Sequence, residues 1–339
     1  MNRKMKKILS YIVLLLCIGA IIFCTCLLIY ARKPIDMAQS AAVLVDIPTG
    51  TSFIKVTEIL GNAGLVEHKF LFYTLVWIKR GTRSIRAGEY EFATSITPFE
   101  MIDKLIRGEI KKYRVTVHED YTLTEVAERL KEYKLIDEKM FFELAVDAEF
   151  LSSMGVRGSS VEGYLFPDTY FLNRSMSTKQ IIRMMVDRFW SKISEDMMKK
   201  AAARGLNQNQ FVTLASLVGK ESGNTPEKPM IAAVFYNRLK KGMPLQSDPT
   251  TVYDLKDFNG KVLRSHYRRE SPYNTYIIKG LPPGPIANPG LDSFQAVLNP
   301  ADADYLYFVS QKDGTHFFSS SLDAHNRAVL RFRNMTDGD

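Results

Sequence analysis

The chain has 339 residues and a formal net charge of +8 at pH 7, with hydrophobic, charged and aromatic fractions that exclude wholesale disorder. The positive charge is concentrated at the N-terminus, where the first 33 positions hold six basic residues and no acidic residue. The remainder holds 39 of the 45 basic residues and all 37 acidic residues, so no nucleic acid is expected as a partner.

Residues 8–30 form an uncharged run that ends before Arg32-Lys33-Pro34. As a helix it would be about 34 Å long, and a bilayer core is about 30 Å thick. A cleaved signal peptide would have an apolar region of about 7–15 residues and a small-residue cleavage site. We therefore expect an uncleaved membrane anchor with residues 1–7 in the cytoplasm, since four positive charges precede the run and two follow it.

The three cysteines, Cys17, Cys24 and Cys26, all lie within this run. The exported part is therefore expected to have no disulfide, thiol nucleophile or thiol metal site. The five histidines form no HExxH cluster, which argues against a zinc hydrolase. Neither a metal nor a cofactor is expected.

After a linker at 31–44, a repeat appears at an offset of 70 residues, where residues 45–75 align without gaps to residues 115–145. The identical pairs are Val45/Val115, Val56/Val126, Glu58/Glu128, Leu60/Leu130, Leu65/Leu135, Lys69/Lys139 and Phe72/Phe142. Each copy begins with alternating apolar residues, which predict a strand, and then has Ser52 or Thr122 before two helical patterns. The sequence predicts duplicated β-α-α modules.

Between and after the two copies, further elements are predicted. A strand is expected at 86–92 and a short helix at 98–108, closed by Gly108. From residue 160, helices are expected at 179–200, 210–222 and 226–241, a buried strand at 305–310 and a closing helix at 322–332. They alternate with loops rich in Pro, Gly, Asn and Tyr at 162–170, 244–253 and 271–289, and long ordered loops often form binding surfaces.

The helix expected at 210–222 places a carboxylate on its apolar stripe. Leu214, Leu217, Val218 and Glu221 fall at i, i+3, i+4 and i+7. Burial and the C-terminal end of the helix dipole would both raise the pKa of Glu221, which is how a general acid stays protonated near neutral pH. Helical spacing alone leaves open a frayed end at which Glu221 turns into solvent.

The next helix has its own boundary signals: Thr225 suits the N-cap, Pro226 the first helical position and Gly242 the end. On this helix, Arg238 is expected on the solvated face. The following loop places Gln246, Ser247 and Asp248 together, a pattern that is also typical of turns.

The loop SPYNTY at 271–276 contains Tyr273, Asn274 and Tyr276. Aromatic faces and amides suit sugar rings, although tyrosine also packs in ordinary cores.

Five motifs taken together resemble the endolytic murein transglycosylase (YceG-like) family. They are LASLVGKES at 214–222, NRLKKGMPLQSDPT at 237–250, SPYNTY, LPPGPIANPG at 281–290 and EGYLFPDTY at 162–170. The resemblance covers nearly the whole chain. It implies an α+β protein with the N-terminal span at 8–30, a LysM-like module at 45–110 and a catalytic domain at 113–339, in which 113–150 is the second repeat copy.

The resemblance also implies a function. Such proteins are single-pass inner-membrane enzymes with a periplasmic catalytic domain. They cleave the β-1,4 bond between N-acetylmuramic acid and N-acetylglucosamine in nascent glycan strands, leave a 1,6-anhydromuramic end and act as terminators of polymerisation. Their partners would be peptidoglycan strands, the membrane and, as candidates, peptidoglycan synthases. The catalytic glutamate of the family carries over to Glu221, whereas Gly219 replaces the first acid of that motif.

One carboxyl group can serve such a reaction, because the attacking C6 hydroxyl is tethered to the muramic ring. The candidates for the glycan cleft are Glu162, Gln246, Ser247, Asp248, Tyr273, Asn274 and Tyr276, each either a ligand contact or part of loop structure. Asp248 or Glu162 could instead be a second carboxylate that activates water, which would make the protein a hydrolase. A membrane-tethered, non-enzymatic wall-binding scaffold built on the repeats is the third hypothesis.

Overall fold

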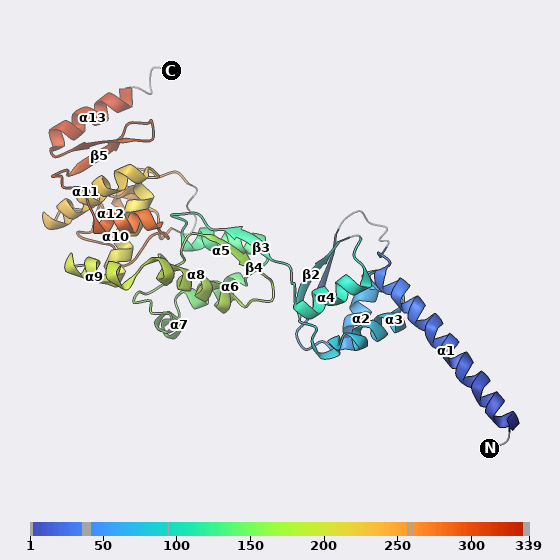
Figure 1. Cartoon of the computed structure of the whole chain (residues 1–339). Coiled ribbons are helices and arrows are strands. Elements are labelled where there is room, and N and C mark those ends of the chain that lie inside the picture. The colour runs from blue at the N-terminus through green and yellow to red at the C-terminus, as the bar shows by residue number, and fades with distance from the viewer. Residues whose placement is uncertain (1–2, 36–41, 94, 256–257, 259, 335–339) are drawn as a thin grey trace. The chain divides into compact units, whose positions relative to one another are not determined.

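The computed structural model describes residues 3–35, 42–93, 95–255, 258 and 260–334, and the chain forms two compact units (Figure 1). Unit 1 is the chain up to Tyr113 together with Asn173–Ser175, and unit 2 holds Arg114–Leu172 and the residues from Met176 on. In the described ranges, helices are combined with three two-stranded sheets. This confirms the mixed α and β composition. Residues 36–41 of the predicted linker lie outside the described residues.

Helix α1 (Arg3–Arg32) begins unit 1 and contains the whole apolar run. It is long and apolar enough to cross a membrane. It extends beyond the predicted 8–30 at both ends, because basic residues are good helix formers and continue the helical turns. Towards its C-terminal end, Leu27 and Ala31 are buried in the core of unit 1.

The first repeat copy folds as a strand and two helices, and the strand predicted between the copies follows it. These are β1 (Val43–Ile47), α2 (Phe53–Asn62), α3 (Lys69–Ile78) and β2 (Gly88–Phe92), with a 3-10 turn at Gly81–Arg83 before β2. Strands β1 and β2 are antiparallel, with Val45 opposite Tyr90. The predicted N-cap is confirmed, because the Ser52 side chain accepts a hydrogen bond from the Lys55 amide.

Helix α4 (Pro98–Arg107) also belongs to unit 1 and is capped at both ends. Thr97 and Glu100 form a capping box at its start. Gly108 ends it with a φ of 67°, a left-handed conformation that glycine adopts without steric cost. The predicted glycine-closed helix is confirmed.

The second repeat copy begins with the same strand and two helices, and a further helix then precedes the strand that pairs with the first. Strand β3 (Tyr113–Thr116) is followed by α5 (Leu123–Glu132), α6 (Glu138–Ala145), α7 (Ala148–Ser153) and β4 (Thr169–Leu172), and β3 pairs with β4. Helix α5 begins and ends 70 residues after α2. Thr122 caps it in a capping box with Glu125, as predicted. The predicted strand-helix-helix order is thus present in both copies, whereas the duplication and the LysM-like assignment stay predictions.

The rest of unit 2 is mainly helical and surrounds one buried helix. Its helices are α8 (Thr178–Lys192), α9 (Glu195–Ala203), α10 (Gln208–Glu221), α11 (Lys228–Lys240), α12 (Leu291–Leu298) and α13 (Leu322–Asn334), with 3-10 turns at Thr225–Glu227, Asp248–Thr251 and His266–Arg268. Helix α10 contacts α9, α11 and α12. The hairpin of β5 (Tyr307–Ser310) and β6 (His316–Ser319) contacts α11 and α13. The closing helix predicted at 322–332 is confirmed as α13.

Three predicted elements need correction. The helix expected at 179–200 is two helices, because Ile193 leaves helical geometry and Ser194 caps a new helix. Thr225 does not cap a continuous helix; it opens a 3-10 turn, and its hydroxyl donates to Asp292 at 2.7 Å. The strand at 305–310 begins at Tyr307 and is only half-buried, because it belongs to a two-stranded hairpin rather than to the interior of a larger sheet.

Candidate active site

Helix α10 brings Glu221 to the site from the centre of unit 2. Asn207 and Gln210 form a capping box at its start. The run Phe211–Gly219 is buried on every side of the helix, not only on the predicted stripe. Glu221 is the last helical residue and is half-buried. The buried helix therefore holds the carboxylate at the point where the core meets solvent.

The surroundings of Glu221 raise its pKa. Burial is the largest cause and raises the pKa from 4.5 to about 7, and the charge of Asp248 acts in the same direction. A hydrogen bond from the Ser247 hydroxyl to Glu221 Oε1 and the charge of Arg238 lower it. The protonated and ionised forms of Glu221 are thus both accessible near neutral pH, as a group that acts first as acid and then as base requires.

Ser247 is buried beside Glu221, so its side chain is not available to a ligand. Its side chain is fully buried, and its backbone N–H donates to Thr275 Oγ1 at 2.9 Å. Gln246, just before it, has a φ of 54°, and its N–H donates to the Thr275 carbonyl at 3.1 Å. The predicted Ser247 is therefore in the site, where it orients the carboxylate. Thr275 was missed, because nothing in the local sequence distinguishes it from a turn residue.

Arg238 is buried, and the prediction that it lies on a solvated face is wrong. Its Nε donates to the Leu306 carbonyl at 2.7 Å, and its Nη1 donates to the carbonyls of Pro244 and Leu245 and to Gln246 Oε1 at 2.9–3.1 Å. A guanidinium can satisfy several carbonyls in this way, and so it fixes the loop that presents Ser247. The sequence did contain a signal for this burial: Arg238 follows Phe235 by three residues and Val234 by four, and both of these are buried.

Asp248 and Tyr276 come together with a tyrosine that the sequence did not single out. Tyr276 donates to Asp248 Oδ1 at 2.5 Å, and Tyr267 donates to Oδ2 at 3.0 Å. The two rings are 4.7 Å apart between centroids. Asp248 remains exposed, whereas burial and the bond to Asp248 raise the pKa of Tyr276. Tyr267 belongs to none of the recognised motifs, so only its contact with Asp248 reveals it.

Glu162 is a second buried carboxylate, but its oxygens are occupied by protein donors. Its Oε2 accepts from the Leu123 N–H and from the Tyr253 hydroxyl, and its Oε1 accepts from Asn288 Nδ2, each at 2.9 Å. Burial raises its pKa to about 7. Glu162 therefore connects the start of α5 to the loops that carry Tyr253 and Asn288.

Asn274 and Tyr273 have different roles in the SPYNTY loop. Asn274 is fully buried, and its amide donates to the carbonyls of His266, Tyr267 and Arg269. It is thus a loop-forming residue rather than a surface available to a ligand. Tyr273 is partly exposed, and its ring lies 4.8 Å from that of Tyr253.

A cavity of about 720 Å³ adjoins these residues. Its walls include Glu162, Asp248 and Tyr253, the start of α5 and Lys220, which precedes Glu221 in the chain. Glu221 is not in the wall itself, but the charge of Asp248 acts on it. In the described ranges, no three His, Cys, Asp or Glu side chains are grouped so that they could hold a metal ion.

The comparison with protein families agrees with the motifs. The sequence model of the YceG-like family matches residues 45–331. The chain belongs to the YceG-like family. The match includes both repeat copies, α10 and the loops around Glu221, and the resemblance recognised from the sequence is confirmed.

Several proteins are similar to this YceG-like chain over most of its length. The endolytic murein transglycosylase of Bacillus subtilis is 32% identical over 316 residues, which are 88% of this chain and 87% of that protein. The protein of the same name from Streptococcus pneumoniae is 29% identical over 89% of this chain and 60% of its own length. A crystal structure of a YceG-like protein from Listeria monocytogenes is 31% identical with a TM-score of 0.60, and covers 85% of this chain and 99% of that one.

Proposed function

We propose that this protein is an endolytic lytic transglycosylase that cleaves N-acetylmuramic acid–β-1,4–N-acetylglucosamine bonds in nascent peptidoglycan, with Glu221 as its acid and base. The names of its relatives support the activity and the substrate. The single observation that supports the role of Glu221 is its raised pKa at the end of a buried helix, beside Ser247.

In the proposed reaction, protonated Glu221 gives its proton to the glycosidic oxygen, and the bond from that oxygen to C1 of the muramic sugar breaks. The C6 oxygen of the same sugar then bonds to C1, and its hydroxyl proton passes to the Glu221 carboxylate. The products are a 1,6-anhydromuramic end and a free 4-hydroxyl, with no water consumed. Because the C6 hydroxyl is tethered to the ring, a second carboxylate is unnecessary.

Three further features belong to the proposal. Helix α1 anchors the protein in the cytoplasmic membrane with its N-terminus inside, so that unit 2 works on the wall side. Residues 45–110 form a LysM-like module, and residues 113–339 form the catalytic domain. The enzyme terminates strands near the membrane, where peptidoglycan synthases are its candidate partners.

A hydrolase is the second candidate, favoured by the exposure of Asp248 in the cavity wall. Asp248 would then activate water, whereas Glu162 suits that role less because each of its oxygens already accepts a hydrogen bond from the protein.

Digestion of isolated peptidoglycan by the wild type and by Glu221→Gln, followed by mass spectrometry, tests the proposal. We expect ends that are one water lighter than reducing ends, and a loss of about 100-fold or more in rate for the variant, since general acid catalysis contributes about 10²–10⁴-fold. Reducing ends alone would identify a hydrolase. Unchanged cleavage by Glu221→Gln would reject Glu221 as the acid, and the absence of any cleavage by the wild type would favour the scaffold.

A further inference from the structure

Helix α3 of unit 1 is apolar on both its faces. No charged residue occurs from Phe70 to Ile78. Its inward residues Phe72, Leu75 and Val76 are buried, whereas outward-facing Phe70, Trp77 and Ile78 are 70%, 73% and 56% exposed. A helix that is hydrophobic all round is ordinarily buried in a core or a membrane. The outward face of α3 therefore lacks the polar surface that water would favour.

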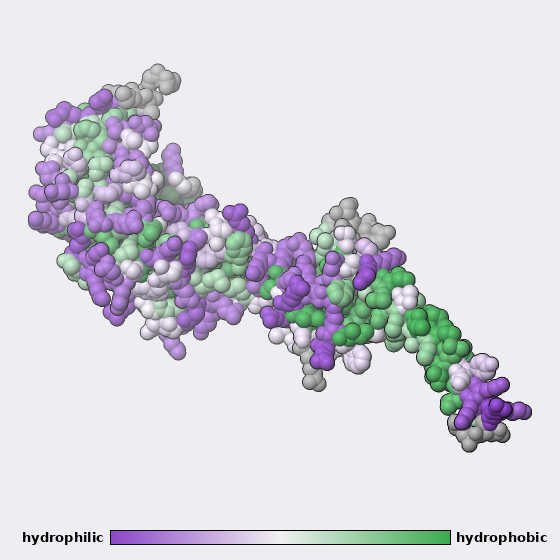
Figure 2. Space-filling model, viewed as in Figure 1, coloured by the Kyte–Doolittle hydropathy of each residue, from purple (hydrophilic) through white to green (hydrophobic). Residues whose placement is uncertain are grey.

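This helix lies against the apolar run of α1. The rings of Phe70 and Phe23 are 6.2 Å apart between centroids, and those of His68 and Tyr30 are 6.0 Å apart. At 1.5 Å per residue, Phe23 lies about 10 Å from Tyr30 along the axis of α1, towards the N-terminus. If residues 8–30 cross the bilayer, the N-terminal end of α3 must reach the same depth as Phe23. Figure 2 shows apolar surface continuing from α1 onto the adjoining part of unit 1.

We propose that the outward face of α3, formed by Phe70, Trp77 and Ile78, is immersed in the bilayer leaflet at the C-terminal end of α1. This inference rests on the proposed anchoring by α1 and adds a second membrane contact. A depth of about 10 Å matches that of interfacial helices, which bury an apolar face by about 5–10 Å. Because α1 is packed into unit 1, the contact would limit how unit 1 tilts relative to the bilayer.

The polar groups around the outward face of α3 are compatible with a lipid environment. The Thr74 hydroxyl donates to the Phe70 carbonyl at 2.9 Å, so it does not need water as a partner. Exposed Lys69 and Arg80 flank the apolar face at its two ends, where their charges can reach anionic lipid headgroups. Tryptophan, here Trp77, is enriched at the membrane interface.

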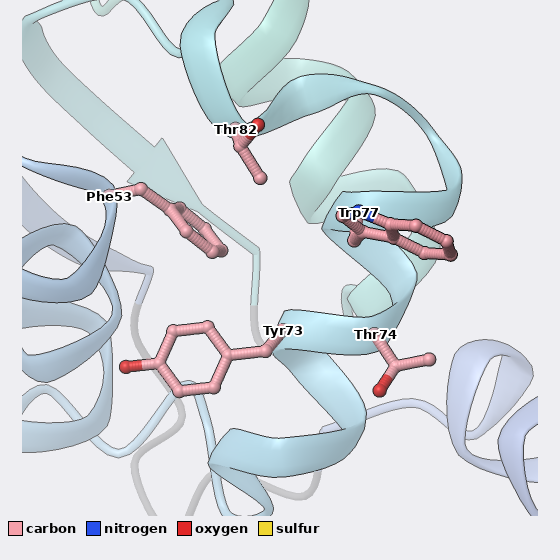
Figure 3. Close-up of a pocket in the computed structure, with 5 residues that line it drawn as sticks. All are labelled: Phe53, Tyr73, Thr74, Trp77 and Thr82. Atoms are coloured by element: carbon pink, nitrogen blue, oxygen red, sulfur yellow. The ribbon is translucent and has the colours of Figure 1, made fainter.

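A glycan is the competing occupant, because an open pocket of about 330 Å³ lies on this side of α3 (Figure 3). Its lining consists of Phe53, Tyr73, Thr74, Trp77 and Thr82. Its polar groups include the hydroxyls of Tyr73, Thr74 and Thr82, and that of Thr74 already donates within α3. Its aromatic faces suit a sugar ring as well as an acyl chain, but its lining has no charged or amide side chain to orient a sugar, and exposed Phe70 and Ile78 on the same helix favour acyl chains.

The chain contains two tryptophans, one in each unit, which makes the test direct. Trp190→Phe leaves Trp77 as the only tryptophan, and Trp77→Phe leaves Trp190, whose ring N–H donates to the Met154 carbonyl in unit 2 at 2.8 Å. Each full-length variant is reconstituted into anionic vesicles with and without brominated acyl chains, and vesicle flotation confirms insertion. Trp77 emission should fall about twofold or more in brominated vesicles and resist aqueous iodide, whereas Trp190 emission should not respond to bromine.

Other results would overturn the inference. If the protein floats with the vesicles but Trp77 is quenched by iodide and not by bromine, the face lies in water. If peptidoglycan oligosaccharides change Trp77 emission and bromine does not, a glycan occupies the face. A protein that fails to float contradicts both the inference and the proposed anchor. The fluorescence does not depend on cleavage, so failure of the proposed chemistry would be seen separately in the digest.

Discussion

The two repeat copies share their core positions and differ where the aligned residues end. Val56 and Leu60 of the first copy are buried, as are their counterparts Val126 and Leu130 in the second. Beyond the aligned residues, however, α3 continues to Ile78 and exposes Trp77, whereas α6 ends at Ala145 and Asp147 caps a further helix, α7. The copies thus share the core positions that define the module, while the residues that follow them differ.

The two units also differ in what they bury. Among the described residues, the buried polar side chains of unit 1 are Thr57 and Glu89, and its core is otherwise hydrophobic. Unit 2 buries many more, including Glu162, Arg238 and Ser247 close to the site. Buried polar networks are worthwhile mainly where they fix the geometry of particular groups. Unit 1 is therefore stabilised largely by apolar packing, and unit 2 depends on hydrogen bonds as well.

The largest loss of stability is expected when Arg238, whose hydrogen bonds lie within unit 2, is replaced. Arg238→Leu removes the donor of four hydrogen bonds and leaves buried acceptors unsatisfied, so unit 2 should lose about 3 kcal/mol of unfolding free energy. Arg107→Leu in unit 1 is the control and should cost under about 0.5 kcal/mol, because its exposed pair with Glu109 is weak. Urea unfolding in detergent, followed by Trp190 for unit 2 and Trp77 for unit 1, measures both. Equal losses would contradict the contrast between the units.

The helix caps at equivalent positions of the two copies should show a smaller difference. Thr122 accepts from the Glu125 amide at 3.2 Å, and Glu125 Oε2 in return accepts from the Thr122 amide at 2.7 Å. Ser52 makes one bond, to the Lys55 amide at 3.4 Å. We expect Thr122→Ala to cost about 1–2 kcal/mol and Ser52→Ala about 0.5 kcal/mol in the same urea experiment. A greater loss at Ser52 would mean that the first copy depends on its cap more than its geometry implies.

The smallest expected effect is a shift in the pH dependence of cleavage when the hydroxyl of Ser247 is removed. The bond from Ser247 favours ionised Glu221, so Ser247→Ala should raise the pKa of Glu221 further above about 7. Because the proposed acid must be protonated, the fall in cleavage rate on the alkaline side should move to higher pH. Ser52→Ala should leave the profile in place. An alkaline limb that does not move would show that another group controls it.

The same raised pKa has a consequence for stability. The folded-state pKa of Glu221 lies above the unfolded value of 4.5, so its contribution to stability is fully present below pH 4.5. It is lost as the pH rises through about 7, and Glu162 behaves in the same way. The unfolding free energy of unit 2 is therefore expected to decrease over this interval.

Much of the fold was determined by the sequence alone, because the relevant signals are local. The uncharged run at 8–30, the alternation before each repeat helix, and the caps Ser52 and Thr122 each depend on residues within a few positions of one another. The placement of Glu221 at the end of a buried helix follows from the same periodicity. Where local signals competed, as at Ser194, the predicted boundary was wrong.

Only the tertiary structure decided which polar groups meet. Ser247 lies 26 positions from Glu221 in the chain, and Asn288 lies 126 positions from Glu162. Arg238 is buried because the carbonyl of Leu306, 68 positions away, comes within reach of its guanidinium. A hydrogen bond between distant segments depends on how helices and loops pack, and no pattern along one segment contains that information. The sequence therefore located Glu221, the proposed acid, and the packing of unit 2 determined what surrounds it.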